Sequence, residues 1–132
     1  VGEWGGQSEG TDWLFHINYL LDKFDSNQWG QTYWCYYDGL LDNPIMTSLV
    51  RTAPVAVCGA IDKYGYDREN DVFTMSYNQD KEYSLPTEIY VHKKYSAIEC
   101  DAEYTVEPIA DSEAAILKIK GNPGEHSVTI KF

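Results

Sequence analysis

The residues best suited to chemistry lie at the start of the chain. Glu3 follows a Val-Gly pair that is typical of the end of a strand, and Trp4 and the pair Gly5-Gly6 come directly after it. A carboxylate in this position lies at the rim where α/β folds place their sites, and glycines there let a ligand approach the backbone. Glu3 is therefore a candidate catalytic carboxylate, with Trp4 beside it as a candidate binding residue. The alternative is that Glu3 is a solvated residue near the end of the chain.

An aromatic-rich segment supplies a candidate binding surface. Trp34 lies 31 residues after Glu3, about the span of one strand–helix–strand unit, so both side chains would reach the same rim. Indole rings stack on sugar rings, because they cover apolar C–H groups and leave the hydroxyls free to form hydrogen bonds. Tyr36 shares the strand parity of Trp34 and is the expected neighbour in such a site. Core packing of Trp34 remains an equal alternative, whereas Trp13 and Trp29 are expected in the core.

Motifs for metals, cofactors and activated nucleophiles are missing from the sequence. His16, His92 and His126 are far apart and lack the short-spaced partners that zinc sites use, so no metal is expected. There is no phosphate-binding glycine loop and no serine nucleophile elbow, so no cofactor is expected either. Cys35 is expected to be a buried structural thiol. The odd number of cysteines excludes a disulfide framework, although one bridge plus a free thiol stays open.

Composition limits the class of protein and its partners. The 132 residues include 43% hydrophobic residues, enough for a folded domain. The 21 acidic residues against 10 basic ones give a net charge of −11, which repels phosphate backbones, so nucleic acid is not an expected partner. No apolar run approaches the ~20 residues that a transmembrane helix needs, and no signal segment is recognisable at the start.

The elements that must position Glu3 and Trp34 can be predicted from periodicity. An apolar stripe with helical spacing predicts a helix from Asp12 to Phe24. The stripe consists of Trp13, Leu14, Ile17, Leu20, Leu21 and Phe24, and Thr11 or Asp12 would be the N-cap. The run from Trp29 to Tyr37 favours a strand. A strand end, a helix and a strand in this order are typical of a crossover between parallel neighbours. Asn43-Pro44 then starts a short helix that extends to about Leu49.

A change in residue composition after Arg51 indicates a second region. Short runs rich in valine, isoleucine, threonine and tyrosine alternate there with Gly, Pro, Asn and Asp, which favours antiparallel strands packed as a small β-sandwich. The expected strands are Val55–Ile61, Val72–Tyr77, Thr87–Val91, Ile98–Tyr104, Ala115–Ile119 and Ser127–Phe132. The tryptophans, all within the first 34 residues, also mark two regions.

Two sets of motifs resemble a known family. The segments Val1-Gly2-Glu3-Trp4-Gly5-Gly6 and Gly30-Gln31-Thr32-Tyr33-Trp34-Cys35-Tyr36-Tyr37, with a helix between them, resemble the seventh and eighth β/α units of a family 5 glycoside hydrolase. The stretches Leu49 to Gly59, Val72 to Tyr77 and Pro86 to Val91 are similar to the junction and C-terminal sandwich of its endoglycoceramidase branch. That junction usually reads Arg-Pro-Tyr-Pro, whereas Thr52 and Ala53 stand here at its middle positions.

The resemblance implies a mixed fold: the last strand–helix–strand elements of a (β/α)8 barrel in residues 1–51, followed by an antiparallel β-sandwich in residues 52–132. It implies Glu3 as the nucleophile of a retaining endo-glycosidase and Trp34 as the platform for the sugar next to the scissile bond. The acid/base glutamate of the family ends strand four, so the expected partner is a missing N-terminal barrel portion of the same protein. The isolated chain is then expected to be inactive and to associate through an exposed helix stripe.

The endoglycoceramidase branch further implies a substrate. The bond broken would join an oligosaccharide to ceramide, so a glycan or glycolipid substrate is expected. The compartment stays open, since such an enzyme could be secreted or internal, with a secreted or lysosome-like compartment slightly favoured. Leu40 and Leu41, just after the second strand, would line the lipid side or simply seal the barrel against the sandwich. A different class of function stays open, in which the chain is a non-catalytic β-sandwich module that binds carbohydrate or lipid or serves in packing.

Overall fold

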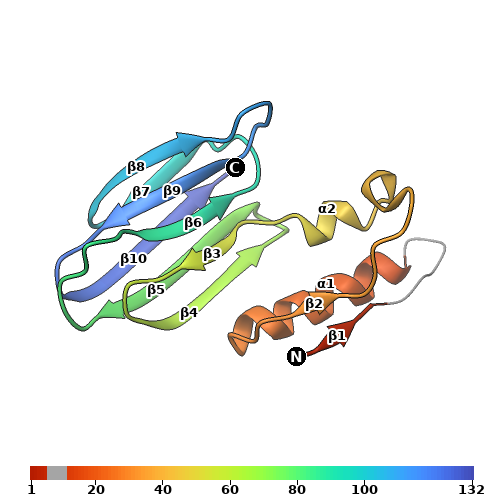
Figure 1. The fold of residues 1–132 in the computed structure, drawn as a ribbon, viewed down its shortest axis with the longest axis horizontal. Coiled ribbons are helices and arrows are strands. Elements are labelled where there is room, and N and C mark those ends of the chain that lie inside the picture. The colour runs from red at the N-terminus through yellow and green to blue at the C-terminus, as the bar shows by residue number, and fades with distance from the viewer. Residues whose placement is uncertain (6–11) are drawn as a thin grey trace. The chain divides into compact units, whose positions relative to one another are not determined.

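Residues 1–5 and 12–132 are described by a computed structural model of the protein (Figure 1). The chain divides into two compact units, Val1–Val50 and Arg51–Phe132. We call them unit 1 and unit 2. Each has its own cluster of buried apolar side chains.

Unit 1 contains a parallel strand pair joined through a helix. β1 (Glu3–Trp4) pairs in parallel with β2 (Thr32–Tyr33), and α1 (Asp12–Ser26) connects them along the chain. The predicted order of strand, helix and strand is therefore confirmed. The helix ends at Ser26, where the side-chain amide of Asn27 donates to the carbonyl of Lys23 at 2.8 Å. The predicted cap residue Thr11 lies outside the described residues.

The apolar stripe of α1 is covered within unit 1. Its central residues Ile17 and Leu21 have no exposed surface, and Phe24 is 6% exposed. They pack against half-buried side chains of unit 1: Trp4, Trp13, Leu20, Tyr33 and Leu49. The expectation that this stripe lies exposed is thus wrong, because the two strands and the short helix α2 (Met46–Leu49) already bury it.

Other parts of unit 1 also differ from the sequence predictions. β2 has two residues rather than the nine predicted from Trp29 to Tyr37, because β1 offers only two residues for pairing. Trp29 is 51% exposed and Cys35 is exposed, so both predictions of burial are wrong. The short helix is preceded by a single 3-10 turn, η1 (Leu40–Asp42).

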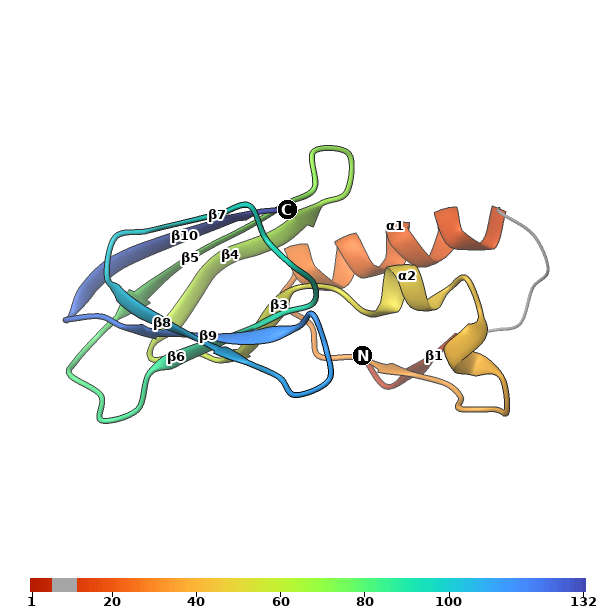
Figure 2. The same ribbon diagram turned by 90° about the horizontal axis from the view of Figure 1, so that it is seen from above.

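Unit 2 is an antiparallel β-sandwich, which confirms the predicted architecture. Its two four-stranded sheets have the orders β4-β5-β10-β7 and β3-β6-β9-β8, and Figure 2 shows them as two layers. The strands are β3 (Ala53–Ala56), β4 (Ala60–Asp67), β5 (Val72–Gln79), β6 (Thr87–Val91), β7 (Ala97–Cys100), β8 (Glu103–Pro108), β9 (Ala115–Lys120) and β10 (Gly124–Lys131).

Two predicted strands are each split between the sheets. The run Val55–Ile61 breaks because Gly59 has φ +124° and packs against β5, so closely that a Cβ there would lie 2.2 Å from the carbonyl oxygen of Asn78. β3 therefore ends before this residue, and β4 begins after it in the other sheet. The run Ile98–Tyr104 is also divided between the two sheets, because β7 and β8 belong to different ones. A strand pattern alone does not reveal such a change of sheet.

The core of unit 2 follows the alternation of side chains along its strands. In β5 the inward residues Phe73, Met75 and Tyr77 are at most 2% exposed, while their neighbours face outward. Inward residues of β6, β9 and β10 complete the cluster: Ile89, Val91, Ala115, Leu117, Ile119, Val128 and Ile130. The burial of these ten side chains is the main favourable contribution to the stability of unit 2.

A polar cluster closes one edge of this core. Thr52 is fully buried, and its hydroxyl lies 2.9 Å from Nδ1 of His92 and accepts a hydrogen bond from the backbone N–H of His92 at 3.3 Å. Burial lowers the pKa of His92, and the nearby Lys93 lowers it further. Lys93 also donates to both carboxylate oxygens of Asp71, at 2.9 and 2.7 Å. These hydrogen bonds, together with one from the Tyr66 hydroxyl, lower the pKa of Asp71.

Replacing Thr52 by valine is expected to lower the free energy of unfolding by about 1–3 kcal/mol, since the backbone N–H of His92 and its Nδ1 would lose their buried partner. Thr74→Val is the matched control, because Thr74 is exposed on β5, and we expect a change below about 0.5 kcal/mol. Urea denaturation followed by far-UV circular dichroism measures both, since all four tryptophans lie in unit 1. Equal stabilities of the two variants would contradict this role of Thr52.

Candidate functional site

The candidate site is built on the β1–β2 pair. Glu3 stands opposite Thr32 and Trp4 opposite Tyr33 in the parallel register. The ladder continues beyond β2, because the backbone N–H of Trp34 donates to the carbonyl of Trp4 at 2.6 Å. The backbone of Trp34 is therefore fixed directly beside the end of β1, and the Trp34–Cys35 peptide bond is cis.

One face of this pair packs against α1. The Trp4 ring contacts Phe24 edge-on at a centroid distance of 5.1 Å and Tyr33 at 5.3 Å. The indole N–H of Trp4 donates to the side-chain oxygen of Gln31. Burial raises the pKa of Tyr33. Trp4 thus belongs to the packed side of the pair, and its role in substrate binding stays a prediction.

The other face of the pair presents the two leading candidates. Alternation along β1 places Glu3 on the face opposite Trp4, and both Glu3 and Trp34 are exposed, Trp34 by 58%. Ideal spacings between and along parallel strands put the Cα atoms of Glu3 and Trp34 roughly 8 Å apart. A carboxylate and an indole at this separation are able to act on one bound sugar ring.

Gly5 fixes the approach of the two strand ends, and its importance is not evident from the sequence alone. Its φ is +148°, and a Cβ added to it would lie 2.1 Å from the carbonyl oxygen of Trp34 and 3.3 Å from the Tyr33 ring. Any side chain at this position would overlap the backbone of Trp34. Gly5 therefore serves to bring the ends of β1 and β2 together rather than to admit a ligand.

Gly5→Ala is expected to lower the unfolding free energy of unit 1 by about 1–3 kcal/mol, because the added methyl group overlaps Trp34 and the backbone conformation disfavours a Cβ. Gly2→Ala is the matched control, since a Cβ there would have no heavy atom within 4 Å. Thermal unfolding followed by tryptophan fluorescence reports on unit 1. Indistinguishable midpoints for the two variants would show that the strand ends do not approach as described.

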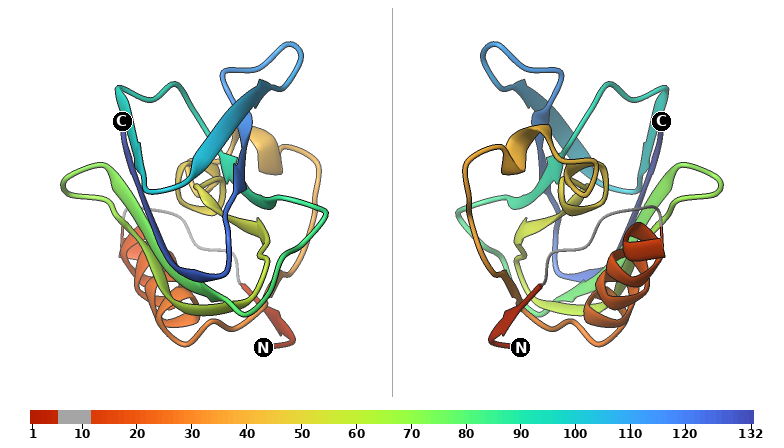
Figure 3. Two further views of the ribbon diagram at one scale, coloured as in Figure 1. Left: turned by 90° about the vertical axis from the view of Figure 1, so that its left-hand side faces the viewer. Right: turned by 90° about the vertical axis from the view of Figure 1, so that its right-hand side faces the viewer.

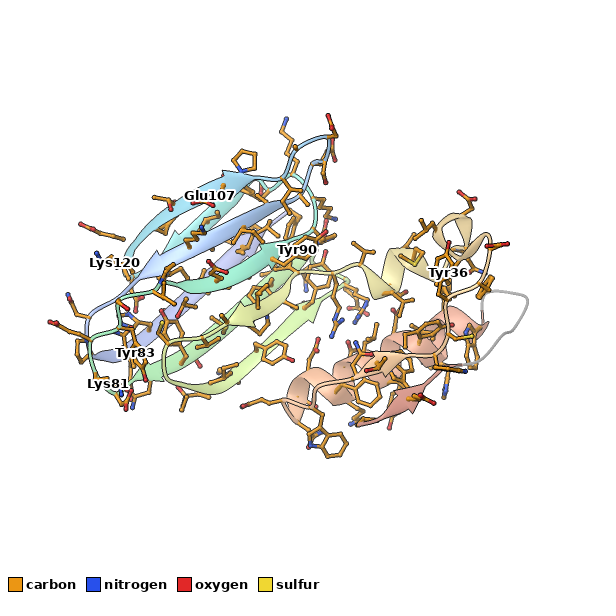
Figure 4. The ribbon with its side chains drawn as sticks, in the orientation of Figure 1. Tyr36, Lys81, Tyr83, Tyr90, Glu107 and Lys120 are labelled. Carbon is orange, nitrogen blue, oxygen red and sulfur yellow. The ribbon has the colours of Figure 1, made fainter. Side chains whose placement is uncertain are left out.

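The remaining candidates lie after β2. Figure 4 shows Tyr36 in the segment that leads to η1. Tyr36 is 70% exposed, but β2 ends at Tyr33, so strand parity no longer relates Tyr36 to Trp34 and its role stays a prediction. Of the two leucines expected either to line the lipid side or to seal the barrel, Leu40 is buried and Leu41 is 70% exposed.

Two further properties concern the whole described chain. Among residues 1–5 and 12–132, no three His, Cys, Asp or Glu side chains are grouped so that they could hold a metal ion. None of the described helices has the length and apolar composition of a membrane-spanning segment.

Solved structures with a similar fold include two glycosidases. Endo-glycoceramidase II from Rhodococcus sp., in complex with a cellobiose-like imidazole, matches with a TM-score of 0.76 and 19% identity over 99% of this chain and 32% of that chain. The same enzyme solved as a lactosyl-enzyme intermediate matches with a TM-score of 0.74 and 18% identity, again over 99% and 32% of the two chains. Sterylglucosidase 1 from Cryptococcus neoformans matches with a TM-score of 0.65 and 14% identity over 90% of this chain and 24% of that chain.

These likenesses establish the fold, and they confirm the resemblance predicted from the sequence. The chain spans about a third of the endo-glycoceramidase II chain and about a quarter of the sterylglucosidase chain. No curated protein sequence matches it. The model of the glycoside hydrolase family 5 C-terminal domain matches residues 51–131, which is more than half of the chain. The chain therefore belongs to that family.

Proposed function

We propose that this chain is the C-terminal part of a retaining endo-glycosidase, with residues 1–51 completing a (β/α)8 barrel and residues 52–132 forming its C-terminal domain. In the intact enzyme Glu3 is the nucleophile that attacks the anomeric carbon. Trp34 stacks on the sugar at the cleaved bond. The observation that carries this proposal is the parallel β1–β2 pair, which contains Glu3 and whose end is extended by the backbone hydrogen bond between Trp34 and Trp4.

The chemistry requires two carboxyl groups. In a retaining mechanism one carboxylate forms a covalent glycosyl ester while the other, about 5–5.5 Å away, protonates the leaving oxygen and then activates water. Glu3 supplies the first group and must be ionised at the working pH. The second group, with a raised pKa, comes from the preceding part of the barrel. The lactosyl-enzyme intermediate of Rhodococcus endo-glycoceramidase II supports a covalent mechanism for the fold.

The proposed substrate is a glycolipid cleaved between its oligosaccharide and ceramide. Both similar structures carry names that denote enzymes of glycosylated lipids, and one was solved as a complex with ganglioside GM3. Within this chain, Tyr36 and Leu41, two and seven residues after Trp34, are both 70% exposed and offer apolar surface. The aliphatic side chain of Leu41 suits a lipid, whereas the aromatic ring of Tyr36 suits a sugar as well.

Replacing Trp34 by alanine in the intact enzyme is expected to lower kcat/KM by roughly 5- to 150-fold, which corresponds to the loss of about 1–3 kcal/mol of transition-state binding. Trp29→Ala is the matched control, because Trp29 is also about half exposed but precedes β2. Release of ceramide from a fluorescent glycosylceramide measures both. Equal rates for the two variants would remove Trp34 from the site.

A further inference from the structure

A groove is present at one end of the β-sandwich of unit 2. It consists of two adjoining cavities of about 630 and 660 Å³, a size typical of ligand pockets, and both are lined by Ala102, Glu103 and Lys120. We call it the β8–β9 groove. The turns that follow β5, β7 and β9 surround it, and the left panel of Figure 3 looks onto this end of the sandwich. No function proposed above uses it.

A tyrosine ring is fixed in one of the two cavities. Tyr83 lines this cavity, and its ring is held in place because its hydroxyl donates to Asp80 at 2.7 Å and the ammonium group of Lys81 lies 5.4 Å from the ring centroid. Tyr104 lines the other cavity, but it stands opposite the buried Ile119 of β9, so its ring lies on the sheet face away from Glu103 and Lys120. Figure 4 shows Tyr83, Lys81 and Lys120 at the same end of the sandwich. The fixed ring of Tyr83 offers the apolar surface on which a sugar ring stacks.

Hydrogen bonds and a close ring contact hold the wall between the turns. His126 lies with Nε2 2.7 Å from the carbonyl oxygen of Asn122 and with Nδ1 3.3 Å from the Asp101 carboxylate. The second oxygen of Asp101 accepts the backbone N–H of Ser127 at 3.1 Å. A Cβ on Gly121 would lie 2.4 Å from the His126 ring, so the imidazole rests directly on the glycine backbone. A preorganised wall lowers the entropic cost of binding.

The groove is lined by more acidic than basic side chains: Glu82, Asp101 and Glu103 against Lys118 and Lys120. Lys118 is neutralised from outside the groove, by Glu107 at 2.7 Å and Glu88 at 3.8 Å. Glu103 and Lys120 stand opposite each other across β8 and β9, and neither side chain has a hydrogen bond or ion pair with any residue that the structure describes. The excess of carboxylates repels an anionic ligand. Glu103 and Lys120 supply an acceptor and donors for the hydroxyl groups of a neutral ligand.

We propose that the β8–β9 groove binds an uncharged oligosaccharide. Tyr83 stacks on a sugar ring, and Glu103 and Lys120, which line both cavities, bind hydroxyl groups. The open shape across two cavities fits a chain of several sugars rather than a single one. This site lies entirely within unit 2 and does not depend on the catalytic role proposed for Glu3.

Isothermal titration calorimetry of the 132-residue chain with cellohexaose, chitohexaose and lacto-N-neotetraose tests the proposal. We expect at least one of them to bind with a Kd below about 1 mM. Glu103→Gln and Lys120→Gln, which remove the two charges, and Tyr83→Ala should each weaken binding at least tenfold. Tyr90→Ala is the matched control, because Tyr90 lies on β6 outside both cavities, and it should leave the Kd unchanged.

Trp34→Ala separates this site from the proposed catalytic site. Binding that persists in Trp34→Ala and is weakened by the groove variants supports the β8–β9 groove. Binding lost in Trp34→Ala but kept in Glu103→Gln and Lys120→Gln would overturn it, as would the absence of binding by all three oligosaccharides. Tighter binding of an anionic polysaccharide such as heparin would contradict the uncharged ligand.

Discussion

The intact enzyme is expected to lose at least about four orders of magnitude in kcat when Glu3 is replaced by glutamine. The amide keeps the size and shape of the carboxylate but cannot form the glycosyl ester, so no covalent intermediate is reached. Substrate binding should persist, because Trp34 and the neighbouring surface are unchanged. Release of ceramide from a fluorescent glycosylceramide measures turnover, and fluorescence anisotropy of the same substrate measures binding.

Glu69→Gln is the control for this change of charge, since Glu69 is exposed in the turn between β4 and β5 of unit 2. It should retain the activity of the unmodified enzyme. Turnover by Glu3→Gln within tenfold of the unmodified enzyme would show that the catalytic carboxylate lies elsewhere. Loss of both turnover and binding would point to a structural role for Glu3 instead.

The isolated 132-residue chain is expected to have no detectable glycosidase activity. Two carboxyl groups are required, and the resemblance to family 5 enzymes places the acid/base on an earlier strand of the barrel, outside this sequence. The chain spans only 32% of the endo-glycoceramidase II chain. A barrel also needs about 250 residues to close and to exclude water from the site.

An assay of the isolated chain with an aryl glycoside and with glycosylceramide checks this expectation, and the intact enzyme serves as the positive control. Adding the preceding barrel portion as a separate polypeptide provides a second test, because it restores the missing carboxyl group. Hydrolysis by the isolated chain alone would show that it contains both catalytic groups.

Helical periodicity was sufficient to predict α1 and its buried face. The spacing of Ile17, Leu21 and Phe24 fits one side of a helix, and all three side chains are buried. Periodicity did not reveal what covers that side. The residues that cover it, among them Trp4 and Tyr33, come from strands too short to have a pattern of their own.

The strands of unit 2 were predicted where one sheet contains the whole run. β6 has the predicted bounds, Thr87–Val91, because its hydrophobic residues alternate in a single sheet. The predictions failed at Gly59, whose conformation ends β3, and again between β7 and β8, where no glycine or proline marks the passage from one sheet to the other. Changes of sheet depend on tertiary packing, which local sequence does not encode.

The candidate site was predicted from residue types and the span between them. Glu3 and Trp34 were selected from the sequence, and the structure places the ends of their strands side by side. Gly5 was interpreted as room for a ligand, because its contact with the Trp34 carbonyl depends on a strand pair formed by residues far apart in sequence. The β8–β9 groove was missed for the same reason, since three separate turns surround it.

Trapping of the covalent intermediate tests the central claim most directly. A 2-deoxy-2-fluoroglycosyl fluoride slows hydrolysis of the glycosyl ester more than its formation, so the labelled carboxylate accumulates in the intact retaining enzyme. Proteolysis and mass spectrometry then locate the label. We predict one fluoroglycosyl group per enzyme, on Glu3, and none on the Glu3→Gln variant. A label on any other carboxylate, or equal labelling of Glu3→Gln, would contradict the assignment of Glu3 as the nucleophile.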